Sequence, residues 1–341
     1  MDKAIERGCL NTAYDKLGTP DVRIIDSESP DYLVDRGGER IFGVEVTEIY
    51  ANEGAARIVK IKGYSTQILS KKPYRHKDDA KYLPLEKVRF PGKDGRKEME
   101  VDGVVQQLPS FQERVALLTE KIAAKTRKIG SYTTKAPEID LLIYDPTGLF
   151  SFSDFPKFFP ALSYRLGRAA IINSKFREVV LLVRRISGKT IRVPIKLNIL
   201  VGELIAFDTL IRKSRSRLAR NPRKILYLVA ALNLAGFHAL RASIEKGVFC
   251  VHCGPWVVRY EKGSKNIVDG TLQKPSPKAE LLGEAVSLQT HLTSEERKFA
   301  RRLVARRKKV VACAPLFFEF DLDENFKRRQ DIKAQKKMRA R

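Results

Sequence analysis

The sequence predicts an α/β protein in which a mixed central sheet is flanked by helices. Three observations favour this fold class. Two short apolar runs meet at Gly37-Gly38, and glycine tolerates the positive φ angles that a tight hairpin needs. The apolar runs at 138–145 and 177–183 are bounded by turn signals, which is typical of strands covered on both faces. Helical periodicity precedes the hairpin and returns before these later strands.

The two helices of this first region have recognisable ends. Residues 3–17 form an amphipathic pattern that Gly18 and Pro20 terminate, and Val22 to Ile25 follow as a short strand. Ser110 is a suitable N-cap for a helix over 111–129, with Glu113 completing a capping box. The apolar stripe of this second helix consists of Val115, Leu118, Ile122 and Ile129. Gly130 ends it.

The hairpin over residues 30–48 carries an acid at the outer end of each strand, Asp31 and Glu45. If Asp35 pairs with Arg40, Asp31 lies opposite residue 44, and a one-residue bulge near the glycines brings it opposite Glu45. Both registers place the two carboxylates at one end of the sheet, close enough to share a divalent cation. Mg²⁺ suits such a pair because it prefers a few hard oxygen ligands and retains several waters.

Two further regions surround this core. Residues 51–110 form a charged insertion, expected to be helical over about 53–69 and then a basic loop or small hairpin. From about 190 to 341 we expect a basic, mostly α-helical domain. It has a strand over 191–200 and helices over 204–218, 223–245 and from Ser294. Thr293 or Ser294 caps the last helix, and a basic tail begins at Phe326.

The charge balance indicates a polyanionic partner. The 341 residues include 65 Lys and Arg against 40 Asp and Glu, which gives a formal charge of +25. Nucleic acid is the commonest such partner, and a membrane surface fits less well. The N-terminus has no apolar segment like that of a signal peptide, and the apolar run 225–240 is too short to span a bilayer. With four cysteines, these features predict a cytoplasmic protein without a disulfide framework.

Other chemistries find little support in the sequence. Cys250 and Cys253 have the spacing of half a zinc site, but no second pair completes four ligands, while Cys313, His238 and His291 are scattered. We therefore expect buried, unliganded cysteines. The chain contains no P-loop, no dinucleotide-binding glycine motif and no G-x-S-x-G sequence.

The hairpin resembles the PD-(D/E)XK nuclease superfamily, whose fold is restriction-endonuclease-like. Pro30-Asp31 stands at the position of the family's PD, and Glu45-Val46-Thr47 stands at the position of (D/E)-X-K. The resemblance covers about residues 1–190, and the order helix, hairpin, helix, strand, strand agrees with it. The chain departs from the motif at Thr47, where the family has a lysine that orients or activates the attacking water.

The resemblance implies roles for particular residues. Asp31, Glu45 and the main-chain carbonyl of Val46 would bind Mg²⁺ or Mn²⁺. Glu6, or less favourably Asp15, would be a third acid from the opening helix. Lys121 or Lys125 would replace the missing lysine, whereas Lys60 has no defined place relative to the sheet. The residues expected to hold the nucleic-acid backbone are Lys71, Lys72, Arg75, Lys77, Arg301, Arg302, Arg306, Arg307, Lys308 and Lys309.

The expected function is therefore that of a metal-dependent endonuclease that hydrolyses phosphodiester bonds, with DNA favoured over RNA. The alternative is a non-catalytic nucleic-acid-binding protein that retains a degenerate nuclease fold, as a component of an assembly or a defence system. Protein partners or a homodimer are compatible with both.

Overall fold

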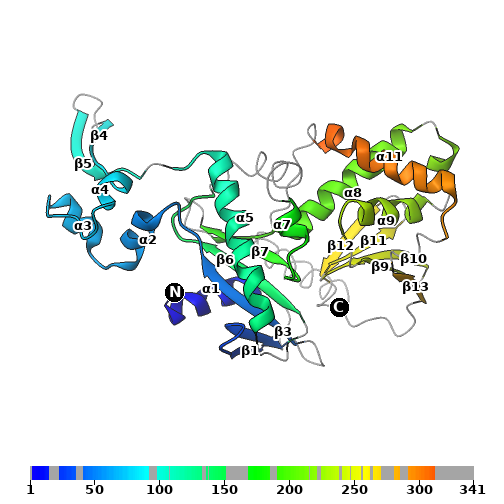
Figure 1. Ribbon diagram of the computed structural model, residues 1–341, viewed down its shortest axis with the longest axis horizontal. Coiled ribbons are helices and arrows are strands. Elements are labelled where there is room, and N and C mark those ends of the chain that lie inside the picture. Colours follow the sequence, from blue (N-terminus) through cyan, green and yellow to red (C-terminus); the bar gives the residue numbers. More distant parts are fainter. Residues whose placement is uncertain are drawn as a thin grey trace, which may run out of the picture.

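The computed structural model describes the chain between residues 2 and 311, with gaps. The described residues are 2–14, 23–35, 41–91, 98–106, 108–132, 136, 138–150, 168–184, 190–214, 216–220, 224–237, 240–245, 247–254, 256–261, 264–269, 280–284 and 291–311. They form a six-stranded sheet, a five-stranded sheet and a two-stranded ribbon, together with helices (Figure 1). The basic tail predicted from Phe326, and also Asp15 and Cys313, lie outside them.

The first half of the chain is built on the six-stranded sheet, whose order is β1-β2-β3-β6-β7-β8. Its strands are β1 (Arg23–Asp26), β2 (Tyr32–Asp35), β3 (Ile41–Glu48), β6 (Ile139–Asp145), β7 (Val179–Arg184) and β8 (Thr190–Pro194). β1, β2 and β3 form an antiparallel meander, β6 and β7 continue parallel to β3, and β8 is antiparallel to β7. The predicted α/β class with a mixed central sheet is confirmed.

Helices cover both faces of this sheet, because successive residues of its central strands alternate between two apolar faces. On one face, α1 (Lys3–Tyr14) packs its Leu10 and Tyr14 against Val44, Leu142 and Val180. α1 matches the first predicted helix. These three residues follow α1 in the sequence by 30 residues or more, so long-range contacts contribute to closing this face.

On the other face lies α5 (Phe111–Lys128), the second predicted helix. The hydroxyl of Ser110 accepts a hydrogen bond from the Glu113 amide, and the Glu113 carboxylate accepts one from the Ser110 amide at 2.7 Å. The predicted capping box is therefore confirmed. The fully buried side chains Val115, Leu118 and Ile122 hold the helix against the sheet. The cap and this apolar stripe fix both the start and the rotation of α5.

The insertion after β3 folds as a small module. Its elements are α2 (Glu53–Lys60), α3 (Tyr64–Leu69), α4 (Asp79–Tyr82), β4 (Leu85–Pro91) and β5 (Glu98–Val104). Tyr64, Ile68 and Leu83 form its core, and the buried Asp79 pairs with Arg57 at 2.5 Å. The predicted helical segment over 53–69 is found as two helices. For the remainder of the insertion the sequence predicted either a basic loop or a small hairpin, and the structure contains the hairpin of β4 and β5.

The C-terminal region contains, beside its helices, a sheet that the sequence did not predict. An antiparallel five-stranded sheet, with the order β12-β11-β10-β9-β13, forms a large part of it. Its strands are β9 (Leu240–Glu245), β10 (Val248–Cys253), β11 (Trp256–Glu261), β12 (Ser264–Asp269) and β13 (Glu280–Glu284). The helices of this half are α8 (Ile195–Lys213), α9 (Lys224–Leu234) and α11 (Ser294–Val311), which lie together on one side of the sheet (Figure 1).

Two predicted boundaries are wrong for local reasons. The strand expected over 191–200 ends at Pro194, and the helix begins at Ile195, since proline is compatible with a helix start but not with its interior. The helix expected over 223–245 ends at Leu234 because Gly236 adopts a φ of 103°, which terminates the helical path. The chain then enters β9 at Leu240.

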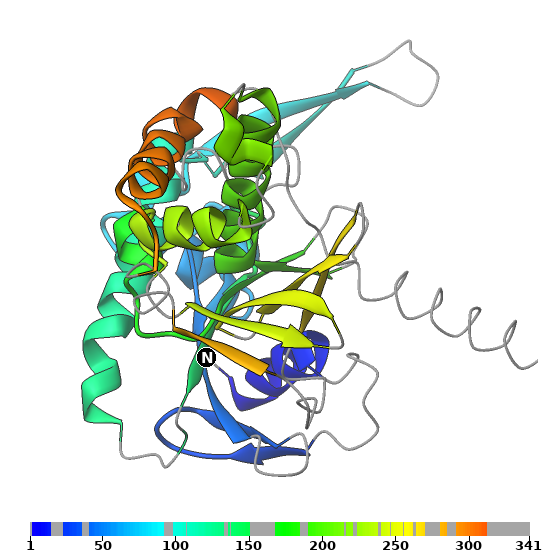
Figure 2. The same ribbon diagram turned by 90° about the vertical axis from the view of Figure 1, so that its right-hand side faces the viewer.

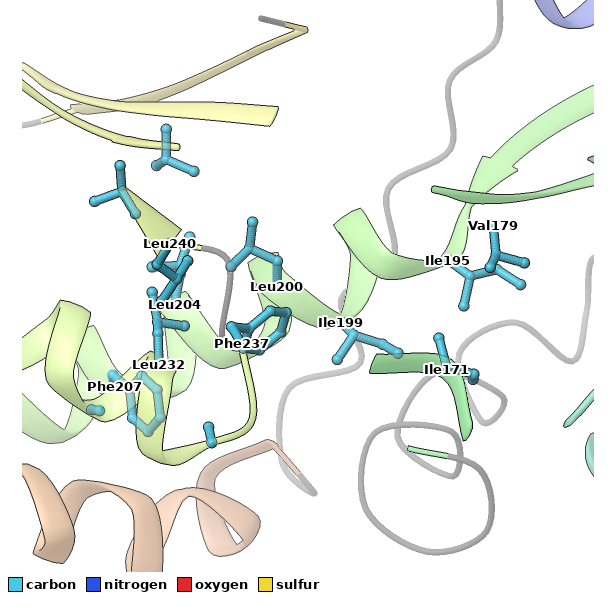
Figure 3. Close-up of a cluster of buried hydrophobic side chains, with 14 of the residues drawn as sticks. Ile171, Val179, Ile195, Ile199, Leu200, Leu204, Phe207, Leu232, Phe237 and Leu240 are labelled. Carbon is cyan, nitrogen blue, oxygen red and sulfur yellow. The ribbon is translucent and has the colours of Figure 1, made fainter. Parts of the chain in front are cut away.

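The two halves share one apolar core. The buried side chains of Ile171, Val179 and Ile195 continue through α8 to Leu204 and Leu240 at the second sheet (Figure 3). Beside this core, the buried Glu178 accepts hydrogen bonds from the Lys196 and Leu197 amides at the start of α8 and from the Trp256 indole. One carboxylate therefore caps α8 and links β7 to β11.

None of the helices in the described ranges is long and apolar enough to cross a lipid bilayer.

Truncation of the α5 stripe should destabilise the protein. We expect Leu118→Ala, which empties a fully buried position, to lower the free energy of unfolding by about 2–5 kcal/mol. Leu108→Ala, at a side chain that is 63% exposed, should change it by less than about 0.5 kcal/mol. Denaturant unfolding followed by circular dichroism measures both, and equal effects would contradict the proposed packing of α5.

Candidate active site

The register of the β2–β3 hairpin brings the two predicted acids side by side. Tyr32 lies opposite Val44 and Asp35 opposite Ile41, so the same register continued by one residue places Asp31 opposite Glu45. Of the two registers that the sequence predicts, this is the one that pairs Asp31 with Glu45 and not with residue 44. Pro30 packs directly on Gly43, where an added Cβ would lie 2.4 Å from the proline ring. This close approach fixes the position of the strand that carries Asp31.

Asp31 is tied to the neighbouring strand by its own side chain. Its Oδ2 accepts a hydrogen bond from the Val46 amide at 2.8 Å. Because the N–H and C=O of a strand residue point to the same side, the Val46 carbonyl also faces Asp31. Partial burial raises the pKa of Asp31, and the Glu45 and Glu6 charges raise it further, while the Val46 hydrogen bond and Lys125 oppose the rise. Asp31 is thus a carboxylate whose negative charge its surroundings do not fully compensate.

Lys125 brings a cation to this pair. Its Nζ lies 2.5 Å from Oε1 of the buried Glu45, although 80 residues separate the two in the sequence. The lysine projects from α5, one turn after the buried Ile122, and its side chain is 21% exposed. Of the two predicted replacements for the family lysine, Lys125 is the one that contacts an acid of the site. Thr47 is partly exposed and follows Glu45 by two positions on β3.

Lys121 lies one turn earlier on α5 and extends the positive charge away from Glu45. Burial lowers the pKa of Lys121, and the neighbouring ammonium groups of Lys125 and Lys60 lower it further. Lys60 itself pairs with Glu48, at the end of β3, at 3.4 Å. The three lysines therefore form a row next to the two acids. The place of Lys60, which the sequence left undefined, is at the far end of this row.

Glu6 does not join the two acids. Its carboxylate is bound by the Tyr32 hydroxyl at 3.2 Å and by Lys3 at 3.1 Å. Tyr32 packs in the cluster beside α1, and consecutive strand residues face opposite sides of a sheet. Glu6 thus lies on the α1 side, whereas Asp31 and Glu45 lie on the α5 side. Its charge still reaches Asp31 and contributes to the raised pKa of that residue.

Tyr132 is a site residue that the sequence reading missed. Its hydroxyl is buried just after α5, near Glu45, and makes no hydrogen bond of ordinary geometry among the described residues. Burial raises the pKa of this hydroxyl, and the charges of Glu45 and Asp31 raise it further. The only available signal was a tyrosine two residues after Gly130, the residue that ends the predicted helix.

The oxygen atoms of Asp31, Glu45 and Val46 supply part of the ligand set that a hard divalent cation requires. Two carboxylates and the Val46 carbonyl face one another, and Mg²⁺ is commonly bound through one or two carboxylates with waters completing the shell. The raised pKa of Asp31 is consistent with a position that a cation would stabilise. Within the part of the chain that the structure describes, no three acids, histidines or cysteines come together as a ready-made metal site.

The predicted backbone-binding residues have different positions. Lys71, Lys72, Arg75 and Lys77 are all exposed on the module after α3. On α11, which a Thr293–Glu296 capping box begins, Arg301, Arg302 and Arg306 are exposed.

Arg307, in contrast, lies 3.1 Å from the buried Glu203, to which Arg168 also binds at 2.6 Å. It therefore serves the packing of α11 on α8. The side chains of Lys308 and Lys309 are outside the described part of the structure. Cys250 and Cys253 both lie on β10, where Cys250 is buried and Cys253 is partly buried.

No protein-family model, no curated protein and no solved structure matches this chain.

The charges around Asp31 should shift its titration in opposite directions. Glu45 raises the pKa of Asp31 and Lys125 lowers it. We therefore expect Glu45→Gln to lower the pKa of Asp31 and Lys125→Met to raise it. Titration of the aspartate carboxyl carbons by NMR measures both shifts, and shifts of the same sign in the two variants would disprove the arrangement.

Asp31 should also cost stability at neutral pH. A carboxyl whose pKa is raised on folding contributes most below its ordinary pKa of 3.8, and this contribution is lost as the pH rises through the folded value. Asp31→Asn should therefore raise the melting temperature at pH 7, with the gain vanishing in acid. Asp78→Asn, at an exposed position of the module, is the matched control. A gain that persists unchanged at low pH would contradict this explanation.

Proposed function

We propose that this protein is a metal-dependent endonuclease that hydrolyses phosphodiester bonds in DNA. The observation that carries the proposal is the contact of Lys125 with Glu45 at 2.5 Å. The pairing of β2 with β3 also places Asp31 opposite Glu45. Two acids on adjacent strands with a lysine are the chemical elements of the PD-(D/E)XK motif, here with the lysine supplied by α5. The order of α1, the β1–β3 meander, α5 and the parallel strand β6 also supports it.

Each residue has a distinct part in the proposed reaction. Asp31, Glu45 and the Val46 carbonyl would hold the cation, which when bound polarises the phosphodiester and lowers the pKa of a coordinated water. Lys125 orients Glu45 and places a positive charge where negative charge develops on the phosphoryl oxygens. The partly buried Lys121 extends this positive surface toward the next phosphate. The exposed bases of the module and of α11 would hold the backbone farther away.

The alternative is a nucleic-acid-binding protein without catalysis. One observation favours it: Lys125 already occupies one oxygen of Glu45, so a cation that binds through both acids competes with an existing ion pair. The same ion pair can thus support catalysis or replace the metal. The two functions differ in whether metal-dependent cleavage accompanies binding.

A cleavage assay with matched variants tests the proposal. We expect the wild-type protein to cut plasmid or single-stranded DNA in Mg²⁺ or Mn²⁺. Asp31→Asn, Glu45→Gln and Lys125→Met should each lower the rate by about a hundredfold or more. Lys128→Met, at an exposed position of the same helix, should retain cleavage. All four variants should still bind DNA with a steep dependence on salt.

Three results would redirect this proposal. Salt-sensitive binding by the wild-type protein, without cleavage in either metal, would support the non-catalytic alternative. Cleavage of RNA in preference to DNA in parallel reactions would keep the chemistry and change the substrate. Equal loss of activity in Lys128→Met and Lys125→Met would show that the general charge of α5, and not the contact with Glu45, is what matters.

A further inference from the structure

A cavity lies where the two larger sheets of the molecule meet. Figure 1 shows these sheets side by side, and Figure 2 views the molecule from the five-stranded sheet. The cavity has a volume of about 650 Å³. Its walls come from the segment 172–177 between α7 (Arg168–Ile172) and β7, the first two turns of α8, and the turn between β10 and β11. Sites for small molecules commonly have volumes of about 300–1,000 Å³ and lie at such junctions.

Part of the cavity lining is apolar and held in place. The side chains of Phe176, Leu200, Phe237 and Trp256 line it and are otherwise buried. Leu200 and Phe237 belong to the apolar core that the two halves share (Figure 3). The indole of Trp256 donates a hydrogen bond to Glu178 at 2.5 Å, which fixes the orientation of its ring. An apolar or aromatic group can therefore pack here against side chains that are already positioned.

Lys196 brings a positive charge to the same cavity. Its Nζ donates hydrogen bonds to the main-chain carbonyls of Ser174, at 3.0 Å, and of Phe176. Both acceptors are neutral, and no carboxylate of the described residues forms an ion pair with this ammonium. Burial lowers the pKa of Lys196, while the charge of the nearby Glu178 opposes this fall. Because an ammonium has three N–H donors, one remains for a group inside the cavity.

The other charges that line the cavity leave Lys196 as its main electrostatic feature. Arg177 is already bound to Asp140 by two hydrogen bonds, at 2.8 and 2.6 Å. Lys175 and Glu138 have opposite charges and are exposed, so water and salt screen both. The partly buried ammonium of Lys196 is screened less, and a negative group that enters the cavity would compensate its charge.

We propose that this cavity binds a small organic anion, whose carboxylate or phosphate group pairs with Lys196 and whose apolar or aromatic body packs beside Trp256 and Phe237. An inorganic anion alone would fill only a small part of the volume and would leave the apolar lining unused. The bound anion contacts both halves of the chain and so stabilises their junction. The inference does not depend on the nuclease proposal, because none of these residues belongs to the Asp31–Glu45 site.

The fluorescence of Trp256, the single tryptophan of the chain, reports directly on the cavity. We expect phenylbutyrate or phenyl phosphate to change this fluorescence with a dissociation constant on the order of 1 mM or lower. The uncharged phenylbutyramide should bind at least about tenfold more weakly than phenylbutyrate, because it cannot form a charge-assisted hydrogen bond with Lys196. The tighter of the two anions identifies the preferred head group.

Variants of α8 test the part of Lys196 in this binding. Lys196→Met should raise the dissociation constant for the tighter anion at least about tenfold, and Lys196→Arg, which keeps the charge, should recover most of the affinity. Lys213→Met is the matched control, since it removes an exposed lysine at the other end of the same helix. It should bind like the wild type.

The comparison of phenylbutyrate with its amide uses the wild-type protein, so it decides the proposal even if Lys196→Met does not fold. Equal affinities for these two compounds, or no fluorescence change with either anion, would overturn the proposal. So would unchanged binding in Lys196→Met with a native circular dichroism spectrum, because the negative group would then lie elsewhere.

Discussion

The feature on which the site depends is the pairing register of β2 and β3. Side chains alternate across a strand, so a shift of one residue would turn Asp31 and Glu45 to opposite faces of the sheet. Pro30 packed on Gly43 restricts the strand to one position. The register forces two acids together at a partly desolvated place, as the raised pKa of Asp31 indicates. Such an arrangement costs folding energy, and functional sites are where proteins commonly accept this cost.

The compensating charge depends on how α5 is held. Lys125 reaches Glu45 because the capping box at Ser110 sets where the helix starts and the apolar stripe sets which face meets the sheet. A lysine at position 47 would share β3 with Glu45, so the strand alone would bring the two residues together. Moving the cation to a helix makes the site dependent on long-range packing, since 80 residues separate Lys125 from Glu45. The core and the candidate chemistry are therefore linked through one helix.

Local patterns predicted much of the first half, and part of what they missed depends on long-range contacts. The strands near 139 and 179 and the helix after Ser110 follow from runs and caps that a short window contains. The start of α8 follows Pro194, which a short window contains, whereas the carboxylate that caps the helix comes from Glu178, outside such a window. Gly236 was a visible stop signal before β9. The sequence offered Lys121 and Lys125 of α5 equally, and only tertiary packing distinguished Lys125.

The module and the candidate site are physically connected. Glu48, at the end of β3, pairs with Lys60 of α2, and the lysine row continues through Lys121 to Lys125. Because Glu48 follows Glu45 on β3 by three residues, this ion pair links the position of α2 to the candidate site.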